Sequence, residues 1–244
     1  MTADVVARLR AAGCVFAEEE AALLLADGRD LDGLVARRVA GEPLEQVLGW
    51  VGFCGLRVLL DPGVFVPRQR TALLVEQAVA LGGRVVVDLC CGAGAVGLAV
   101  AAGLGDVELV AADLDPAAVA CARRNGVGAV VGDLYDALPS GLRGRVDLLC
   151  VNAPYVPTDA IDAMPPEARD HEPAVALDGG PDGLDLHRRV AAGARDWLAP
   201  GGSLLLETSR RQVDGTVAAV EGGGLRARVV ADDDRGAVVV VGTR

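Results

Sequence analysis

The feature that most constrains the fold of this 244-residue chain is an alternation of short apolar runs with helical stretches, which starts near residue 84. Four apolar runs of strand length alternate with segments of helical periodicity, and they lie at 84–89, 107–112, 129–131 and 146–151. Buried strands joined by helices are typical of a parallel sheet. Later apolar runs predict a fifth strand and a closing antiparallel hairpin, at 203–207, 225–230 and 237–241. We therefore expect an α/β fold with a seven-stranded, mostly parallel sheet.

The first part of the chain has a different pattern. Apolar residues recur near a 3.6-residue period over 4–38, and another short helical stretch at 44–48 follows the break at Gly41-Glu42-Pro43. This pattern predicts a small helical appendage formed by residues 1–49.

A hairpin is expected between this appendage and the main domain. The runs 56–60 and 64–66 flank Asp61-Pro62-Gly63, a sequence that favours a tight turn. We therefore expect a β-hairpin linker at 50–67, followed by the main domain at 68–244.

The first strand of the sheet ends in a glycine-rich turn that opens directly into a helix. This turn contains Asp88, Cys90, Gly92 and Gly94. Glycine lets the backbone approach a ligand closely, and the start of a helix offers free N–H groups. The turn therefore predicts a site for a nucleotide-like ligand.

Acidic residues also follow the second and third strands. Asp113, with Leu114 after it, ends the second strand, where a carboxylate can accept hydrogen bonds from both hydroxyls of a ribose. Asp133 follows the third strand and can accept from an adenine amino group, while Leu134 or Tyr135 can cover the adenine ring. These positions indicate an adenosine site.

The identity of the cofactor follows from what the glycine turn lacks. An NAD site would also use a glycine-rich turn, but here Cys90 occupies the first glycine position of G-x-G-x-x-G and the third glycine is wrongly spaced. Acidic residues at three strand ends suit adenosine and an ammonium group better than a pyrophosphate. The predicted cofactor is S-adenosyl-L-methionine, bound by Asp88, Cys90, Gly92, Gly94, Asp113, Leu114, Asp133, Leu134 and Asn152.

The fourth strand leads into the tetrapeptide Asn152-Ala153-Pro154-Tyr155. Ligands bind at the carboxyl ends of strands in open α/β sheets. The side-chain carbonyl of Asn152 and the backbone carbonyl of Ala153 can together accept both hydrogens of a planar NH2 group, which Tyr155 can cover. Taken alone, the tetrapeptide also fits an ordinary turn after a strand.

With these pieces in order, the chain resembles the HemK/PrmC-type protein-(glutamine-N5) methyltransferases, which belong to the Rossmann-like class I S-adenosylmethionine-dependent methyltransferases. The likeness lies in Gly41-Glu42-Pro43-Leu44, Val66-Pro67-Arg68, Asp88 to Gly94, Asp113 with Pro116, Asn152 to Tyr155, Arg169 to Leu177 and Asp182 to Asp185. The resemblance implies in-line methyl transfer to a glutamine side-chain amide of a protein, with a release factor as a possible acceptor. It makes 68–244 the catalytic domain and the appendage a substrate-recognition element.

The resemblance also implies roles for individual residues. The catalytic set is Asn152, Ala153, Pro154 and Tyr155, and the substrate-binding set is Asn152, Tyr155, Arg68 and Glu172. Glu172 lies in the segment 156–182, which we expect to fold over the acceptor; an exposed acidic loop residue is the alternative.

The chain departs from the family pattern in three places. Ala153 replaces the first proline of N-P-P-Y, which keeps the backbone acceptor and loses stiffness. Gln69-Arg70-Thr71-Ala72 stands where the family has P-(E/D)-T-E, and the appendage is short. The acceptor therefore stays open between a protein glutamine, a small-molecule or peptide amide or amino group, and a nucleic-acid base. A protein that binds the cofactor without turnover is a further alternative.

Charge and composition narrow these alternatives. The net charge is -11 and no lysine occurs, so the surface repels phosphate backbones and nucleic acid is an unlikely partner. No apolar run is long enough to span a membrane and no signal-peptide pattern opens the chain, so we expect a soluble cytoplasmic protein. The six cysteines form no C-x-x-C pair and the two histidines have no metal-ligand spacing, so no metal site is expected.

Overall fold

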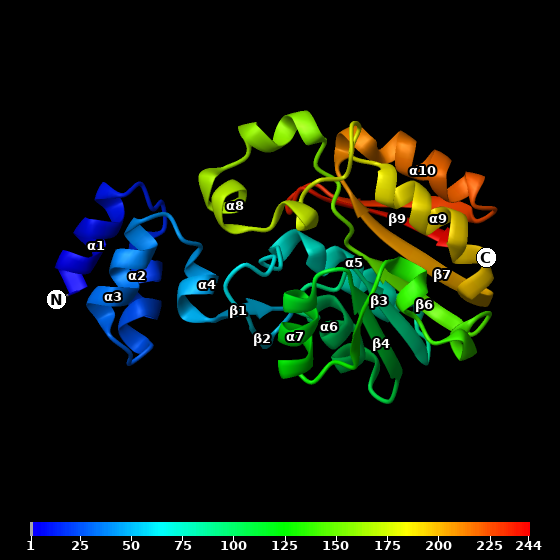
Figure 1. Cartoon of the computed structure of the whole chain (residues 1–244), viewed down its shortest axis with the longest axis horizontal. Coiled ribbons are helices and arrows are strands. Elements are labelled where there is room, and N and C mark those ends of the chain that lie inside the picture. Colours follow the sequence, from blue (N-terminus) through cyan, green and yellow to red (C-terminus); the bar gives the residue numbers. More distant parts are fainter. Residues whose placement is uncertain (1) are drawn as a thin grey trace.

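In the computed structural model, which describes residues 2–244, seven strands form one sheet in the order β5-β4-β3-β6-β7-β9-β8 (Figure 1). The strands are β3 (Val85–Leu89), β4 (Glu108–Asp113), β5 (Ala129–Val131), β6 (Val146–Val151), β7 (Leu198–Thr208), β8 (Arg226–Asp232) and β9 (Ala237–Thr243). The first five are parallel, and β9 runs antiparallel to both β7 and β8. The expected α/β fold with a seven-stranded, mostly parallel sheet is confirmed.

The strand order reverses between β3 and β6, which are hydrogen-bonded neighbours at the centre of the sheet. The chain proceeds from β3 through β4 to β5 on one side, and from β6 to β7 on the other. The connections therefore diverge at the carboxyl ends of β3 and β6 and leave a crevice there, which is where open α/β sheets bind ligands.

Helices cover both faces of the sheet, as a parallel sheet requires. One face carries α5 (Ala72–Leu81), α6 (Ala95–Leu104) and α7 (Pro116–Arg124), and the other carries α9 (Asp185–Trp197) and α10 (Val213–Gly222) (Figure 1). Because side chains alternate along a strand, Val86 packs under the first group of helices and Val87 under the second.

Local sequence explains where α7 starts, and a backbone hydrogen bond joins the glycine turn to the end of β4. Asp115 caps the helix by accepting a hydrogen bond from the Ala117 N–H at 2.8 Å, and Pro116 occupies the first turn, where no N–H is needed. The carbonyl of Ala112, at the end of β4, accepts from the Cys91 N–H at 3.1 Å. The ends of β3 and β4 are therefore held together at the crevice.

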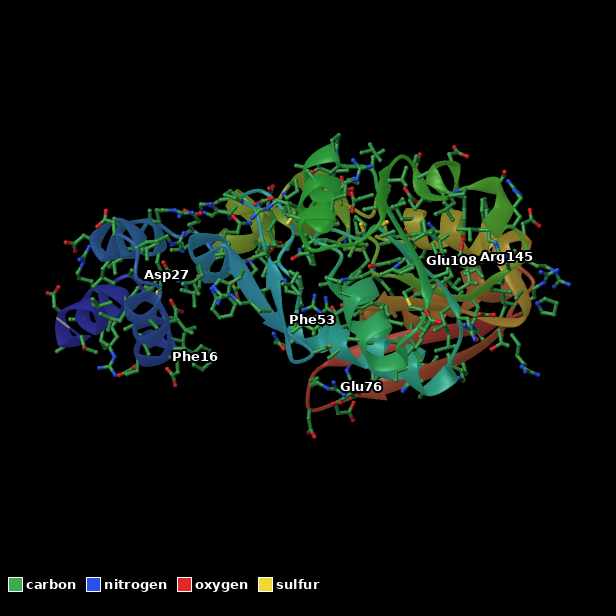
Figure 2. All side chains as sticks on the ribbon, turned by 90° about the horizontal axis from the view of Figure 1, so that it is seen from below. Phe16, Asp27, Phe53, Glu76, Glu108 and Arg145 are labelled. Carbon is green, nitrogen blue, oxygen red and sulfur yellow. The ribbon has the colours of Figure 1, made fainter. Side chains whose placement is uncertain are left out.

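Four helices, α1 (Thr2–Ala11), α2 (Ala17–Ala26), α3 (Leu31–Val39) and α4 (Leu44–Leu48), lie together at one end of the molecule (Figure 1). They share a small apolar core that includes Val5, Leu9 and Leu24. Phe16 lies outside that core, on the surface of this end (Figure 2). The helical texture predicted for residues 4–38 and 44–48 therefore corresponds to four short helices.

The expected pairing of the hairpin is wrong. The run 56–60 pairs with the preceding residues, as β1 (Trp50–Phe53) and β2 (Leu56–Leu59), and the run 64–66 forms no strand. The turn between β1 and β2 is Cys54-Gly55, in which both residues have positive φ (48° and 78°), as a two-residue hairpin turn with right-handed strand twist requires. The run 64–66 is apolar because Val64 and Val66 are buried in the core.

The segment 156–182 carries several short helical turns rather than an open loop. It contains 3-10 turns at Thr158–Ala163 and Ala174–Ala176, and between them the helix α8 (Pro166–His171). This segment lies between the appendage and the carboxyl ends of the strands (Figure 1). Within residues 2–244, no helix has the length and apolar character needed to cross a membrane.

Candidate active site

A cavity of about 460 Å³ opens at the carboxyl ends of the parallel strands, a size in the usual range for small-molecule sites. The tertiary structure brings nearly all predicted site residues to its wall: Arg68, Asp88, Cys90, Gly92, Asp113, Leu114, Asp133, Leu134, Asn152, Ala153, Pro154, Tyr155 and Glu172. Gly94 is the exception. The segment 156–182 contributes one side of the cavity, through residues such as Met164 and Val175.

Gly94 packs against the protein rather than facing the cavity. It is buried with φ at 78°, and a Cβ atom built on it would lie 2.9 Å from Val127 Cγ2 and 3.2 Å from Ala122 Cβ. Gly94 is the N-cap residue of α6 and has left-handed backbone angles. Glycine at this position therefore permits a close approach of the start of α6 to Ala122 of α7 and to Val127. A contact between Gly94 and the cofactor stays a prediction.

Gly92 faces the cavity. Its φ is 54°, and a Cβ atom built on it would meet nothing within 4 Å. Its N–H donates to Asp113 Oδ2 at 2.8 Å, so the glycine turn is fastened to the end of β4. Cys90 also has positive φ, at 56°, which is uncommon for a residue with a side chain and marks a tightly constrained turn.

Asp88 is a carboxyl group buried at the base of the cavity. It is 1% exposed, and its Oδ2 accepts from the Gly97 N–H at 2.8 Å. Burial raises the pKa of Asp88 to about 7, the Gly97 N–H opposes this rise, and the nearby Asp113 charge adds to it. Among residues 2–244 no arginine or histidine pairs with Asp88, so the carboxylate is suited to a cationic group of a ligand.

Asp113 lies at the end of β4, with both carboxylate oxygens engaged by the backbone. Oδ2 accepts from Gly92 and Oδ1 from the Asp115 N–H at 2.9 Å. Burial raises the pKa of Asp113, and the backbone N–H groups oppose this rise. Each oxygen retains a lone pair for a ligand hydroxyl. Leu114 beside it is 54% exposed on the cavity wall and offers apolar surface to a ligand.

Asp133 and Leu134 follow β5. Asp133 Oδ2 accepts from Arg189 Nη2 at 2.8 Å, so one of its two oxygens is already paired. Leu134 is buried and has positive φ, at 49°. These residues lie on the same cavity wall as Gly92 and Asp113. An adenosine fits this wall chemically, because carboxylate acceptors alternate with apolar side chains along it.

The tetrapeptide after β6 presents free acceptors to the cavity. The Asn152 side chain is half-buried and makes no hydrogen bond to any other residue in the range 2–244. Ala153 is 1% exposed and lines the cavity. An amide oxygen and a neighbouring carbonyl therefore remain available for an NH2 group.

Tyr155 is held at both ends. Gln212 Nε2 donates to its backbone carbonyl at 2.8 Å, and its hydroxyl accepts from Arg70 Nη2 at 2.9 Å and donates to Glu207 Oε1 at 3.1 Å. Burial raises the pKa of Tyr155 to about 12, Glu207 adds to this rise, and Arg70 opposes it. The hydroxyl therefore stays protonated at neutral pH. The ring of His187 lies behind Tyr155, with 6.3 Å between the ring centroids.

Glu172 is buried and points toward the cavity, so it is no exposed loop residue. Its carboxylate accepts from Arg68 Nη2 and from the Val66 N–H, the latter at 3.2 Å. Burial raises the pKa of Glu172, and the Arg68 charge opposes that rise. The pair lies on the cavity wall where the segment 156–182 meets the stretch that leads into α5.

Several residues of the site carried no usable signal in the sequence. Glu207 and Gln212 approach Tyr155 from β7 and from the turn before α10, and Arg189 approaches Asp133 from α9. Arginine, glutamate and glutamine occur on most protein surfaces, so their types do not distinguish them. Only Arg70 stood out, because it departs from the pattern of the family that the chain resembles.

Comparisons with known proteins give the family of the chain. The family model described as the methyltransferase small domain matches residues 55–164. A release factor glutamine methyltransferase of Geobacter sulfurreducens is 38% identical over 220 residues, which cover 87% of this chain and 76% of that protein. A 4-amino-L-phenylalanine/4-methylamino-L-phenylalanine methyltransferase of Streptomyces pristinaespiralis is 38% identical over 192 residues, covering 73% of this chain and 65% of that protein.

One solved structure supports the fold. A methyltransferase from Pyrococcus furiosus has a TM-score of 0.58 at 16% sequence identity, and the alignment covers 85% of this chain and 96% of that one. At this identity the likeness concerns the arrangement of strands and helices.

Proposed function

The chain belongs to the release factor glutamine methyltransferase family, and we propose that it methylates the side-chain amide nitrogen of a glutamine in a peptide chain release factor. It is an S-adenosylmethionine-dependent methyltransferase. The observation that carries the proposal is that the acceptors of Asn152 and Ala153 lie in the same cavity as the buried carboxyl group of Asp88, which has no cationic partner among residues 2–244.

The residues present fit the cofactor. Asp88 offers a buried carboxylate to an ammonium group, and Asp113 offers acceptors to ribose hydroxyls. Gly92 leaves room for close approach along the turn. Bound S-adenosylmethionine supplies an electrophilic methyl group on a sulfonium.

The chain's own residues prepare the acceptor. An amide nitrogen is a poor nucleophile because its lone pair is delocalised, so the rate must come from positioning, for which roughly 7 to 11 kcal/mol is available. In the proposal, Asn152 Oδ1 and the Ala153 carbonyl each accept one hydrogen of the glutamine NH2 group, and Tyr155 packs on its flat face. One of these hydrogens leaves as a proton when the nitrogen gains the methyl group.

The helices α1 to α4 belong to the proposal as the part that recognises the protein substrate. Arg38 of α3 donates to Glu167 of α8 at 2.7 Å, which connects these helices to the segment beside the cavity. Gln46 of α4 donates to the carbonyls of Val64 and His171, at 3.2 and 3.4 Å. A protein held by the appendage would therefore reach the cavity along this segment.

The test is transfer of labelled methyl groups from S-adenosylmethionine to a release factor of the same organism, with the modified residue identified by mass spectrometry. Label on one glutamine is expected. Asn152→Ala should lose transfer by about 100-fold, far more than it lowers cofactor affinity, because it removes an acceptor for the amide and leaves the glycine turn and Asp113 intact. Asp113→Ala should weaken cofactor binding in calorimetry.

A free amino acid is the second candidate acceptor, because the Streptomyces pristinaespiralis relative named as a 4-amino-L-phenylalanine/4-methylamino-L-phenylalanine methyltransferase has the same 38% identity as the Geobacter sulfurreducens relative, over a shorter alignment. The same assay should therefore include 4-amino-L-phenylalanine. Label on that compound, with none on the release factor, would overturn the proposed substrate and keep the methyltransferase activity.

A further inference from the structure

Three residues from distant parts of the chain meet at the phenol group of Tyr155. Arg70 lies in the 3-10 turn Gln69–Thr71 before α5, Tyr155 follows β6, and Glu207 lies near the end of β7. Arg70 Nη2 is 2.9 Å from the Tyr155 hydroxyl, and Arg70 Nε is 3.2 Å from Glu207 Oε1, which is 3.1 Å from the same hydroxyl. The three groups therefore form a closed triangle of hydrogen bonds.

The side chain of Glu207 forms hydrogen bonds to Arg70 and Tyr155 and to no other described residue. Its side chain is 2% exposed, and its Oε2 has no partner among the described residues 2–244. A buried carboxylate is costly unless it is paired, and Arg70 is the cation that pairs with it. A hydrophobic residue at this position of β7 would be the ordinary choice, since its neighbours Leu204 to Leu206 are all buried.

The backbone of Tyr155 is fixed from the opposite side. Gln212 holds its carbonyl, and a Cβ atom on Gly179 or Gly183 would come within 2.7 Å of Tyr155 Cα or 2.3 Å of Tyr155 O. Because the backbone of Tyr155 is fixed, its ring can move only by rotation about the two side-chain torsions. The bonds of the hydroxyl to Arg70 and Glu207 then determine where the ring lies in the cavity.

We propose that Arg70 and Glu207 are positioning residues that hold the Tyr155 ring as a wall of the acceptor pocket. The role in turnover rests on the proposed function. An amide nitrogen reacts only when it is well oriented, so a ring that moves by about 1 Å is expected to lower the rate strongly. Arg70 acts through Tyr155 and not through contact with the acceptor.

A double-mutant cycle, measured in methyl transfer, distinguishes an Arg70 that positions Tyr155 from an Arg70 that contacts the acceptor. Arg70→Met and Tyr155→Phe should each lower kcat about tenfold, the scale for losing one charge-assisted hydrogen bond, with little change in the KM of the protein acceptor. The double variant should lose no more than about twofold beyond either single one, because both remove the same restraint. Additive losses, near 100-fold in the double variant, would show that Arg70 contacts the acceptor and would overturn the proposal.

The matched control is Arg235→Met. Arg235 is also a partly exposed arginine in ion pairs, with Glu76 of α5 and with Asp232, each at 2.6 Å, and it does not line the cavity. Glu76 lies on the outer surface of the sheet domain (Figure 2). The removal of Arg235 should leave kcat unchanged. A loss equal to that of Arg70→Met would mean that any lost ion pair slows the enzyme, which would also overturn the proposal.

A second measurement needs no acceptor. The chain has two tyrosines, so ring-labelled protein should give two sets of NMR ring signals, and Tyr155→Phe assigns them. Arg70→Met and Glu207→Gln should shift the Tyr155 signals and leave those of Tyr135 in place; unchanged Tyr155 signals would overturn the proposal. If wild-type protein transfers no methyl group to a release factor, the proposed function fails, and these spectra still decide whether Arg70 and Glu207 hold Tyr155.

Discussion

Arg68 and Glu172, which are 104 residues apart, meet at the cavity wall, where Arg68 Nη2 lies 2.6 Å from both carboxylate oxygens of Glu172. The side chain of Glu172 is completely buried and that of Arg68 is 29% exposed. The pair fastens the end of α8 to the stretch that leads into α5. The attraction between the two charges should therefore determine how firmly the segment 156–182 is held beside the cavity.

Glu172→Gln should loosen this segment without unfolding the sheet. The substitution keeps the shape of the side chain and removes the charge that pairs with Arg68, a loss of about 1.5 to 3 kcal/mol for a hydrogen bond to a charged group. Hydrogen exchange should speed up in residues 164–177 and stay slow in β3 and β6. Asp170→Asn is the control, because Asp170 is an exposed α8 residue whose one ion pair within residues 2–244 is with its neighbour Arg169. Equal exchange in both variants would contradict the role of the pair.

Asp88 should make the stability of the protein depend on pH. Its folded pKa, about 7, lies above the ordinary value of 3.8, so its contribution to stability is full below about pH 4 and is lost as the pH rises through 7. The unfolding free energy of the wild type should therefore fall by about 3 kcal/mol relative to that of Asp88→Asn between pH 5 and pH 8. Denaturant unfolding without cofactor measures this difference. A pH-independent difference between the two proteins would show that Asp88 does not titrate in this range.

Alanine at Gly92 and at Gly94 should have different effects. Both glycines have positive φ, so each substitution carries backbone strain of about 1 to 2 kcal/mol. Gly94→Ala also forces a Cβ against Val127, so it should lower the unfolding free energy more than Gly92→Ala does. Gly92→Ala should weaken the binding of S-adenosylmethionine more, as calorimetry can measure. Adding Val127→Ala should restore part of the unfolding free energy that Gly94→Ala loses, because it removes the crowded side chain. The same addition should restore none of the loss caused by Gly92→Ala.

Arg38→Met should destabilise the appendage. Arg38 is 6% exposed and donates to both oxygens of Glu20, at 2.6 and 3.1 Å, so its removal leaves a buried carboxylate without a partner, at a cost of about 3 to 5 kcal/mol. Hydrogen exchange should speed up in α2 and α3. Adding Glu20→Gln should recover much of the loss. Arg8→Met, which breaks the exposed pair with Asp32, should cost less than about 1 kcal/mol.

Local patterns in the chain were sufficient for the seven strands of the sheet, for the helices and for most of the residues that line the cavity. Val85 to Leu89 and Val146 to Val151 are apolar over strand length and lead into polar or glycine-rich turns, which indicated both the parallel sheet and its ligand edge. The carboxyl ends of neighbouring parallel strands must lie together. Asp88, Asp113 and Asn152 could therefore be assigned to one cavity without any knowledge of their distances.

Packing decided what the local pattern left open. The run 64–66 looks like a strand because it is apolar, yet it fills the core beside a hairpin whose partner strand is 50–53. The local pattern explains Gly94 as part of the cofactor turn, whereas its contact with Val127, in another segment, gives a packing reason for glycine that the pattern did not contain.

The restraint on Tyr155 was also decided by tertiary packing. Tyr155 was recognisable in the chain, whereas Arg70 and Glu207 are 85 and 52 residues away from it and meet it only through the folded sheet. The physical reason is that periodicity and turn chemistry are properties of neighbouring residues. A hydrogen bond between distant side chains depends on where every intervening element packs.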